Sequence, residues 1–206
     1  MRIKICGLTR AEDAQYAHDL GAWALGFIFY PLSKRHITAA AAEKIIAQLP
    51  RDALTVGVFV NQVDEAIETA KRISLKAVQL HGDETREDCA HIRHDFSGRI
   101  IKALRPKDAG DLRQIEEYKG VVDYILIDAA VAGSYGGSGV VADWTLAVKA
   151  QDYGLPVILA GGIVPENIRD AAVQVQPHAI DLSSGVESAP GIKDKKKMDK
   201  LFGVKI

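Results

Sequence analysis

Residues 1–9 read MRIKICGLT, and the interpretation of the whole chain starts from them. Ile3 and Ile5 alternate with Lys4 and Cys6, which is the two-residue period of a β-strand with two different faces. The stretch therefore predicts a strand with Cys6 at its carboxyl end. That is the end of a strand at which α/β folds place their chemistry.

A helix is expected directly after this strand. Gly7 ends the strand, and Thr9 and Glu12 have the S/T-x-x-E spacing of a capping box. In such a box, two side chains satisfy the first free amides of a helix, here predicted over residues 10–20. The opening of the chain is thus one strand–helix unit.

The same alternation continues along the whole sequence. Helical patterns follow each of seven further β-rich runs, which are Trp23–Phe29, Leu54–Val60, Lys76–Gly82, Arg99–Leu104, Asp123–Asp128, Leu155–Gly162 and Ala179–Gly185. Eight parallel strands joined by crossover helices can close into a barrel without an exposed edge. We therefore expect an α/β fold, a single-domain (βα)8 TIM barrel over residues 1–206. The alternative, an open doubly wound sheet, lacks its G-x-G-x-x-G signature after the first strand.

Composition and charge narrow the classes of partner. A net charge of −1 gives no electrostatic reason to expect nucleic acid as a partner. No stretch approaches the ~18 uninterrupted apolar residues of a membrane span, and no export signal is recognisable at the N-terminus. Two cysteines are too few for a disulfide framework, so a reducing cytoplasm is the expected location. The composition is compatible with both a monomer and a homodimer.

Polar residues of the predicted strands share one parity. In a closed barrel, one parity of each strand points inward, and a barrel that only packs would fill those positions with Val, Ile and Leu. An acid, a base candidate and a thiol pointing inward near one end suggest a site. The inward polar residues are Lys4, Cys6, Gln79, His81, Asp128, Asp181 and Ser183.

Three glycine-rich stretches lie late in the chain. The pair Gly161 and Gly162 and the stretch Ser183–Gly185, with Ser184 at its centre, end the last two predicted strands. Barrels commonly hold a phosphate there with backbone amides, although tight turns would need the same residues. We expect a phosphorylated substrate. The third stretch, GGSG, contains the further candidates Gly136, Gly137 and Gly139.

Motifs along nearly the whole chain resemble one enzyme family. They read KICGLT, FIFYPLSKRHI, VGVFVN, VQLHGDE, LIDA, YGGSG…DW, LAGGI…ENI and IDLSSGVES…PGIKD. Together they resemble the phosphoribosylanthranilate isomerases of tryptophan biosynthesis. The resemblance implies a (βα)8 barrel that converts N-(5-phosphoribosyl)anthranilate to 1-(2-carboxyphenylamino)-1-deoxyribulose 5-phosphate by an Amadori rearrangement. It also implies that neither a metal nor an organic cofactor is required.

The resemblance assigns roles to the acid and the thiol. A general acid must protonate the ribose ring oxygen, and a general base must then remove the C2′ proton. By resemblance, Asp128 is the acid and Cys6 is the base. Taken without the family, Cys6 is more readily interpreted as a small buried apolar residue, as Cys89 is expected to be, and Asp128 could equally cap the following loop.

Four further charged features of the sequence predict contacts or exposure. Arg35 is expected to bind the anthranilate carboxylate through two parallel hydrogen bonds, although a solvated loop charge would look the same. Asp181 has the parity to pair with Lys4 if the barrel closes, and a contact with the ribose hydroxyls is the minority interpretation. His81 is read as either a structural hydrogen-bonded group or an acid–base residue. Residues 193–197, KDKKK, are expected to form a solvated helix face.

Alternative functions come from two classes. Another phosphosugar barrel, such as an indole-glycerol-phosphate synthase or a histidine-pathway sugar isomerase, would have the same fold. The short chain argues against the first, and Cys6 in place of an aspartate argues against the second. A catalytically silent phosphosugar-binding barrel would retain the glycine loops, but it would have no need of Cys6 and Asp128.

Overall fold

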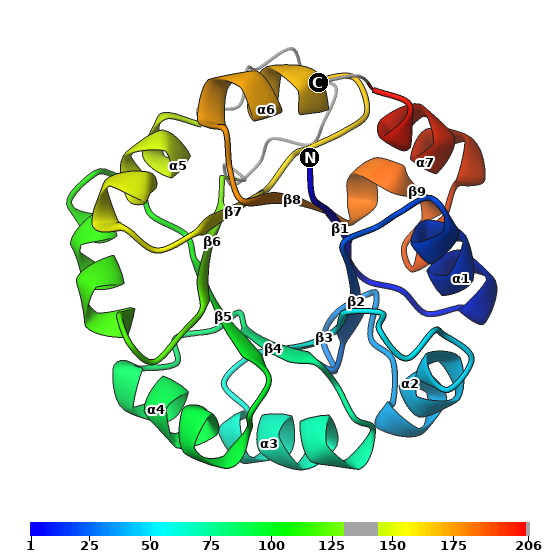
Figure 1. Cartoon of the computed structure of the whole chain (residues 1–206), viewed down its shortest axis with the longest axis horizontal. Helices are drawn as coiled ribbons and strands as arrows, with labels where there is room; N and C mark the ends of the chain where they lie inside the picture. The colour runs from blue at the N-terminus through cyan, green and yellow to red at the C-terminus, as the bar shows by residue number, and fades with distance from the viewer. Residues whose placement is uncertain (130–143, 205–206) are drawn as a thin grey trace.

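A closed ring of parallel strands forms the centre of the molecule (Figure 1). A computed structural model describes residues 1–129 and 144–204 of the chain. Within these residues, eight strands pair in chain order, and the last strand pairs with the first. The strands are β1 (Ile3–Ile5), β2 (Ala24–Ile28), β3 (Thr55–Phe59), β4 (Ala77–Leu80), β5 (Arg99–Leu104), β6 (Tyr124–Asp128), β7 (Val157–Ala160) and β8 (Ala179–Leu182). The predicted barrel is confirmed.

Helices surround the ring on its outer side (Figure 1). The connection between β5 and β6 contains a 3₁₀ helix, η1 (Asp111–Tyr118), where the sequence predicted a helix. Two further 3₁₀ segments are η2 (Gln151–Tyr153) and η3 (Ser184–Val186). The α-helices are α1 (Ala11–Asp19), α2 (Ala39–Ile46), α3 (Val63–Arg72), α4 (Arg86–Asp95), α5 (Thr145–Ala150), α6 (Ile168–Val175) and α7 (Lys195–Phe202).

Strand parity divides the core into two layers. In β4, for example, Val78 and Leu80 belong to the large cluster that the strands form with the helices, whereas Ala77 belongs to a second, smaller cluster. The smaller cluster collects residues of one parity from the strands, as expected for a barrel interior. Gln79 has that same parity and is 1% exposed. The alternation read from the sequence therefore separates the barrel interior from the helix-facing layer.

The start of α1 differs from the prediction. The residue that precedes the helix is Arg10, and its side chain makes no capping hydrogen bond. Thr9 instead donates its hydroxyl hydrogen to the carbonyl oxygen of Gly191 at 2.5 Å. The predicted Thr9–Glu12 capping box is therefore wrong, because a contact with a distant segment engages the threonine.

A short hairpin follows the barrel. Its strands β9 (Glu187–Ala189) and β10 (Ile192–Lys193) pair antiparallel, directly before α7. The prediction that residues 193–197 form a solvated helix face is wrong for Lys193, which lies in β10 and is 3% exposed. Asp194 caps α7 by accepting a hydrogen bond from the amide of Lys197.

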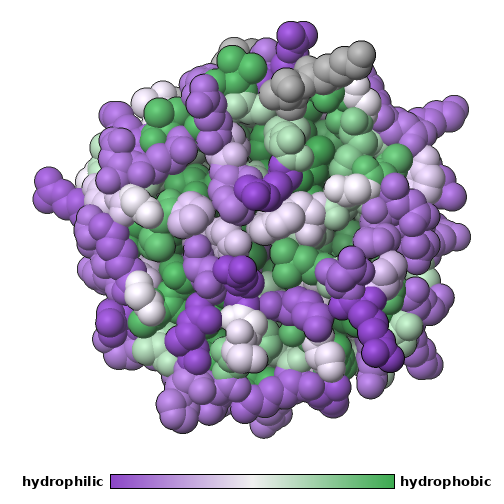
Figure 2. All heavy atoms as spheres, in the orientation of Figure 1, coloured by the Kyte–Doolittle hydropathy of each residue, from purple (hydrophilic) through white to green (hydrophobic). Residues whose placement is uncertain are grey.

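The outer edge of the face seen in Figure 2 is mainly hydrophilic, with hydrophobic side chains between the polar ones. Among the described residues, no helix is long and apolar enough to cross a membrane.

Candidate active site

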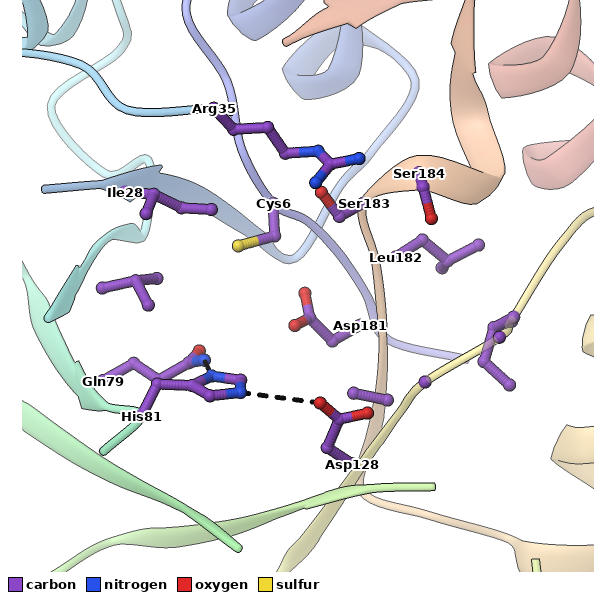
Figure 3. Close-up of a pocket in the computed structure, with 15 residues that line it drawn as sticks. Cys6, Ile28, Arg35, Gln79, His81, Asp128, Asp181, Leu182, Ser183 and Ser184 are labelled. Atoms are coloured by element: carbon purple, nitrogen blue, oxygen red, sulfur yellow. Dashed lines mark hydrogen bonds and ion pairs between the residues drawn. The ribbon is translucent and has the colours of Figure 1, made fainter. Parts of the chain in front are cut away.

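A pocket of about 300 Å³ opens at the carboxyl end of the barrel strands. Its lining comes from strands on all sides of the barrel and from the loops that follow them (Figure 3). Ten of the residues singled out in the sequence line it, namely Cys6, Arg35, Gln79, His81, Asp128, Gly161, Gly162, Asp181, Ser183 and Ser184. Gly136, Gly137 and Gly139 lie outside the described residues.

Cys6 directly follows β1, and its amide donates to the carbonyl oxygen of Leu182 at 2.8 Å, which continues the pairing with β8. The residue is only 4% exposed. Burial raises the pKa of the Cys6 thiol, and the nearby ammonium of Lys4 opposes that rise in part. The pKa of this thiol therefore lies farther above neutral pH than the pKa of an ordinary cysteine. Cys89, by contrast, is fully buried in α4, as expected, and burial raises its pKa to about 12.

Lys4 and Asp181 form an ion pair inside the barrel. They are register partners across β1 and β8, and the Lys4 ammonium lies 2.9 Å from the Asp181 carboxylate. Burial lowers the pKa of Lys4, but the charge and hydrogen bond of Asp181 and those of Cys6 together outweigh it, and the pKa is raised. The pair predicted from strand parity is therefore confirmed. The Asp181 side chain is 10% exposed and reaches the pocket.

Asp128 ends β6 on the other side of the pocket from Cys6 (Figure 3). Its carboxylate lies 3.6 Å from His81 Nε2 and 3.6 Å from Arg105 Nε. The other ring nitrogen of His81, Nδ1, is 2.8 Å from the side-chain amide of Gln79. His81 is thus held by a hydrogen bond, as the structural interpretation predicted, and it also faces the candidate acid. Arg105 was missed in the sequence because it stands in an ordinary polar loop.

Arg35 reaches over the pocket from the loop after β2 (Figure 3). This loop is anchored where the amide of Ile37 donates to the carbonyl oxygen of Ile28 at 2.9 Å. The Arg35 side chain is 24% exposed and forms a bidentate ion pair with Glu187. Nη1 has no hydrogen-bond partner among the described residues. Arg35 is therefore not a solvated loop charge, although no pattern in the sequence indicates Glu187 as its partner.

Gly7 provides room for Arg35. A Cβ atom on Gly7 would lie 2.6 Å from Arg35 Cδ, which is closer than such atoms come in real proteins. The φ angle of Gly7 is +74°, a conformation that side chains disfavour. The glycine in the motif KICG thus lets the Arg35 side chain pass directly over the end of β1.

The two late glycine loops lie side by side. Gly185 is so close to the loop after β7 that a Cβ atom would lie 2.0 Å from the carbonyl oxygen of Ile163. Gly185 itself does not line the pocket, but its neighbour Ser184 and the pair Gly161 and Gly162 do. Close packing at Gly185 therefore brings the ends of β7 and β8 together at one side of the pocket.

Titratable side chains at the carboxyl end of a closed barrel define the class, a (βα)8-barrel enzyme. A family model described as "N-(5'phosphoribosyl)anthranilate (PRA) isomerase" matches residues 3–204. The chain belongs to this family.

Named relatives agree with the family model. The chain is 46% identical to the N-(5'-phosphoribosyl)anthranilate isomerase of Geotalea uraniireducens over 198 residues, covering 96% of this chain and 94% of the relative. It is 47% identical to that of Geobacter sulfurreducens over 195 residues, covering 94% and 93%.

Solved structures agree as well. The phosphoribosyl anthranilate isomerase of Thermotoga maritima superposes with a TM-score of 0.89 at 40% identity, covering 98% of this chain and 96% of that chain. Another isomerase structure, in complex with reduced 1-(o-carboxyphenylamino)-1-deoxyribulose 5-phosphate, superposes with a TM-score of 0.86 at 37% identity and the same coverage.

Proposed function

We propose that this protein converts N-(5-phosphoribosyl)anthranilate to 1-(2-carboxyphenylamino)-1-deoxyribulose 5-phosphate, with Asp128 as general acid and Cys6 as general base. The observation that carries the proposal is that these two side chains enter one pocket from opposite sides, at the ends of β6 and β1. A sugar held between them would present its ring oxygen to one and its C2′ proton to the other.

The first step opens the sugar ring. Asp128 donates its proton to the ring oxygen, the bond from that oxygen to C1′ breaks, and the lone pair of the anthranilate nitrogen forms a C1′–N double bond. A carboxyl group can donate only while it holds its proton. His81, 3.6 Å from Asp128, borders the carboxyl group in the pocket.

The second step moves the hydrogen of C2′. The Cys6 thiolate removes the C2′ proton, and the electrons of that bond form a C1′–C2′ double bond while the positive charge on nitrogen is neutralised. The resulting enolamine then loses its O2′ proton and gains one at C1′, which gives the ketone. One proton leaves the acid and one reaches the base, so the sequence is an isomerisation without net gain or loss of atoms.

Both ends of the substrate carry an anionic group that the site must bind. We assign the phosphate to the loops that contain Gly161, Gly162, Ser184 and Gly185, because backbone amides without obstructing side chains bind anions at barrel ends. We assign the ring carboxylate to Arg35, whose Nη1 group has no partner among the described residues. Asp181 is held by Lys4, and a contact with the ribose hydroxyls would use its exposed edge.

Loss of N-(5-phosphoribosyl)anthranilate, followed by fluorescence with purified protein, tests the proposal. Turnover at a rate typical of enzymes supports it. Binding of the substrate without turnover would instead identify a silent phosphosugar-binding barrel. Inorganic phosphate or sulfate should compete for the glycine loops, and a lack of competition would contradict the assignment of the phosphate.

The oligomeric state and the lack of a nucleic-acid partner are predictions. One solved relative is described as monomers generated from the dimeric phosphoribosylanthranilate isomerase of Thermotoga maritima, and the present chain is proposed to be a monomer or a homodimer. That no nucleic acid is a partner rests on the net charge of −1.

A further inference from the structure

Glu187 and Lys193 lie at the start of β9 and the end of β10, and both are buried. The Glu187 carboxylate accepts hydrogen bonds from Arg35 Nε at 2.8 Å and from Arg35 Nη2 at 2.7 Å. The same carboxylate accepts a hydrogen bond from the Lys193 ammonium at 2.8 Å. One carboxylate thus joins a pocket-lining arginine to a buried lysine.

Lys193 connects this pair to the barrel. Its ammonium donates to the carbonyl oxygen of Cys6 at 2.6 Å and to that of Ser183 at 3.2 Å. With Glu187 these make three acceptors for the three N–H groups of a lysine. The lysine therefore holds the residue after β1 and the residue after β8 at fixed positions relative to the hairpin.

The hairpin is itself fixed to the barrel helices. The backbone amide of Lys193 donates to the Asp13 carboxylate of α1 at 3.0 Å, and Arg10 binds the same carboxylate. At the other strand, the Lys197 ammonium of α7 donates to the backbone carbonyl oxygen of Glu187 at 2.6 Å. Because both strands of the hairpin are hydrogen-bonded to helices, the side chains of Glu187 and Lys193 are held in place more firmly than they would be on a free loop.

We propose that Glu187 and Lys193 are positioning residues, which fix the Arg35 guanidinium and the Cys6 end of β1 in one geometry around the substrate. The inference rests on the proposed function, in which Arg35 binds the ring carboxylate and Cys6 removes the C2′ proton.

The two residues act on different kinetic constants. An arginine side chain that is already held loses less freedom when a carboxylate binds, so Glu187 lowers KM through Arg35. Lys193 positions the backbone of the base, and a small misplacement of a reacting group slows the chemical step. Loss of Lys193 therefore acts mainly on kcat.

The test measures kcat, KM and Tm for Glu187→Gln, Lys193→Met and Arg35→Met. Glu187→Gln keeps the shape of the side chain and is expected to raise KM about tenfold with a much smaller change in kcat. Lys193→Met is expected to lower kcat about tenfold or more. Lys200→Met is the matched control, because it removes an exposed lysine of α7 whose ion pair is with Glu166 and not with the hairpin, and its kinetics should be those of the parent protein.

A double variant separates positioning from general destabilisation. If Glu187 acts through Arg35, Glu187→Gln adds no further increase in KM to a protein that already carries Arg35→Met. A substrate analogue without the ring carboxylate should likewise be insensitive to Glu187→Gln. The inference alone is overturned if Arg35→Met raises KM but Glu187→Gln does not, or if the two effects simply add. If Arg35→Met leaves KM unchanged, the carboxylate role in the proposed function is wrong, and this inference fails with it.

Discussion

Lys4 lies opposite Asp181 across the closure of the barrel, and their charged atoms are 2.9 Å apart beneath the pocket. The same ammonium favours the ionised form of the Cys6 thiol, whose pKa burial raises. Lys4 therefore has two partners. It forms an ion pair with the Asp181 carboxylate, and it favours ionisation of the Cys6 thiol.

Replacement of Lys4 should move the pH dependence of the reaction. A base must be unprotonated, so kcat/KM rises with pH through the Cys6 pKa, which burial places above its ordinary value. Lys4→Met removes the ammonium that opposes the effect of burial, so the rise of kcat/KM with pH should move to higher pH. Lys4→Met with Asp181→Asn, which leaves no unpaired carboxylate, should shift it less. A limb that stays in place or moves to lower pH would contradict the role of Lys4.

Gly7→Ala should weaken substrate binding by displacing Arg35. The new methyl group would meet Arg35 Cδ at 2.6 Å, so the guanidinium must move and KM should rise several-fold. The φ angle adds a destabilisation of about 1 kcal/mol, which is measured as a fall in Tm. Gly21→Ala is the control, because Gly21 has a φ of +88° with open space around it. An equal KM in the two variants would show that the clash with Arg35 has no effect on binding.

Glu187 should make the fold sensitive to acid. Although burial raises the pKa of the Glu187 carboxyl, hydrogen bonds from Arg35 and Lys193 outweigh it and lower the pKa in the folded protein. The unfolded chain then binds a proton more readily, so this stabilisation is complete above about pH 4.3 and is lost as the pH falls through the folded pKa.

Thermal unfolding from pH 7 to pH 3 measures this effect. Glu187→Gln should be less stable than the parent protein at neutral pH, and its Tm should fall less steeply in acid. Glu166→Gln serves as the control, because the pair between Glu166 and Lys200 is largely exposed and contributes little. The same acid slope for the parent protein and Glu187→Gln would rule out this contribution.

Local patterns were sufficient to predict the barrel and its inward-facing groups. A period of two residues assigns each side chain of a strand to one face, so the pairing of Lys4 with Asp181 follows once β8 closes on β1. The positions of Cys6 and Asp128 at strand ends follow from the same reasoning.

Contacts made by the hairpin could not be predicted in this way. Arg35 and Glu187 are 152 residues apart in the sequence, and Lys193 stands in a lysine-rich stretch that resembles a solvated helix. Thr9 failed as a cap for the same reason, because the segment around Gly191 folds back to it. The local periodicity of a sequence does not predict which barrel residues the β9–β10 hairpin contacts.

The most direct test of the account is the turnover of Cys6→Ala and Asp128→Asn. Each variant removes one proton-transfer group, so kcat for N-(5-phosphoribosyl)anthranilate should fall at least about a hundredfold. Far-UV circular dichroism and Tm establish that each variant is folded. Near-normal kcat in either folded variant would contradict the assignment of that residue, and near-normal kcat in both would contradict the account as a whole.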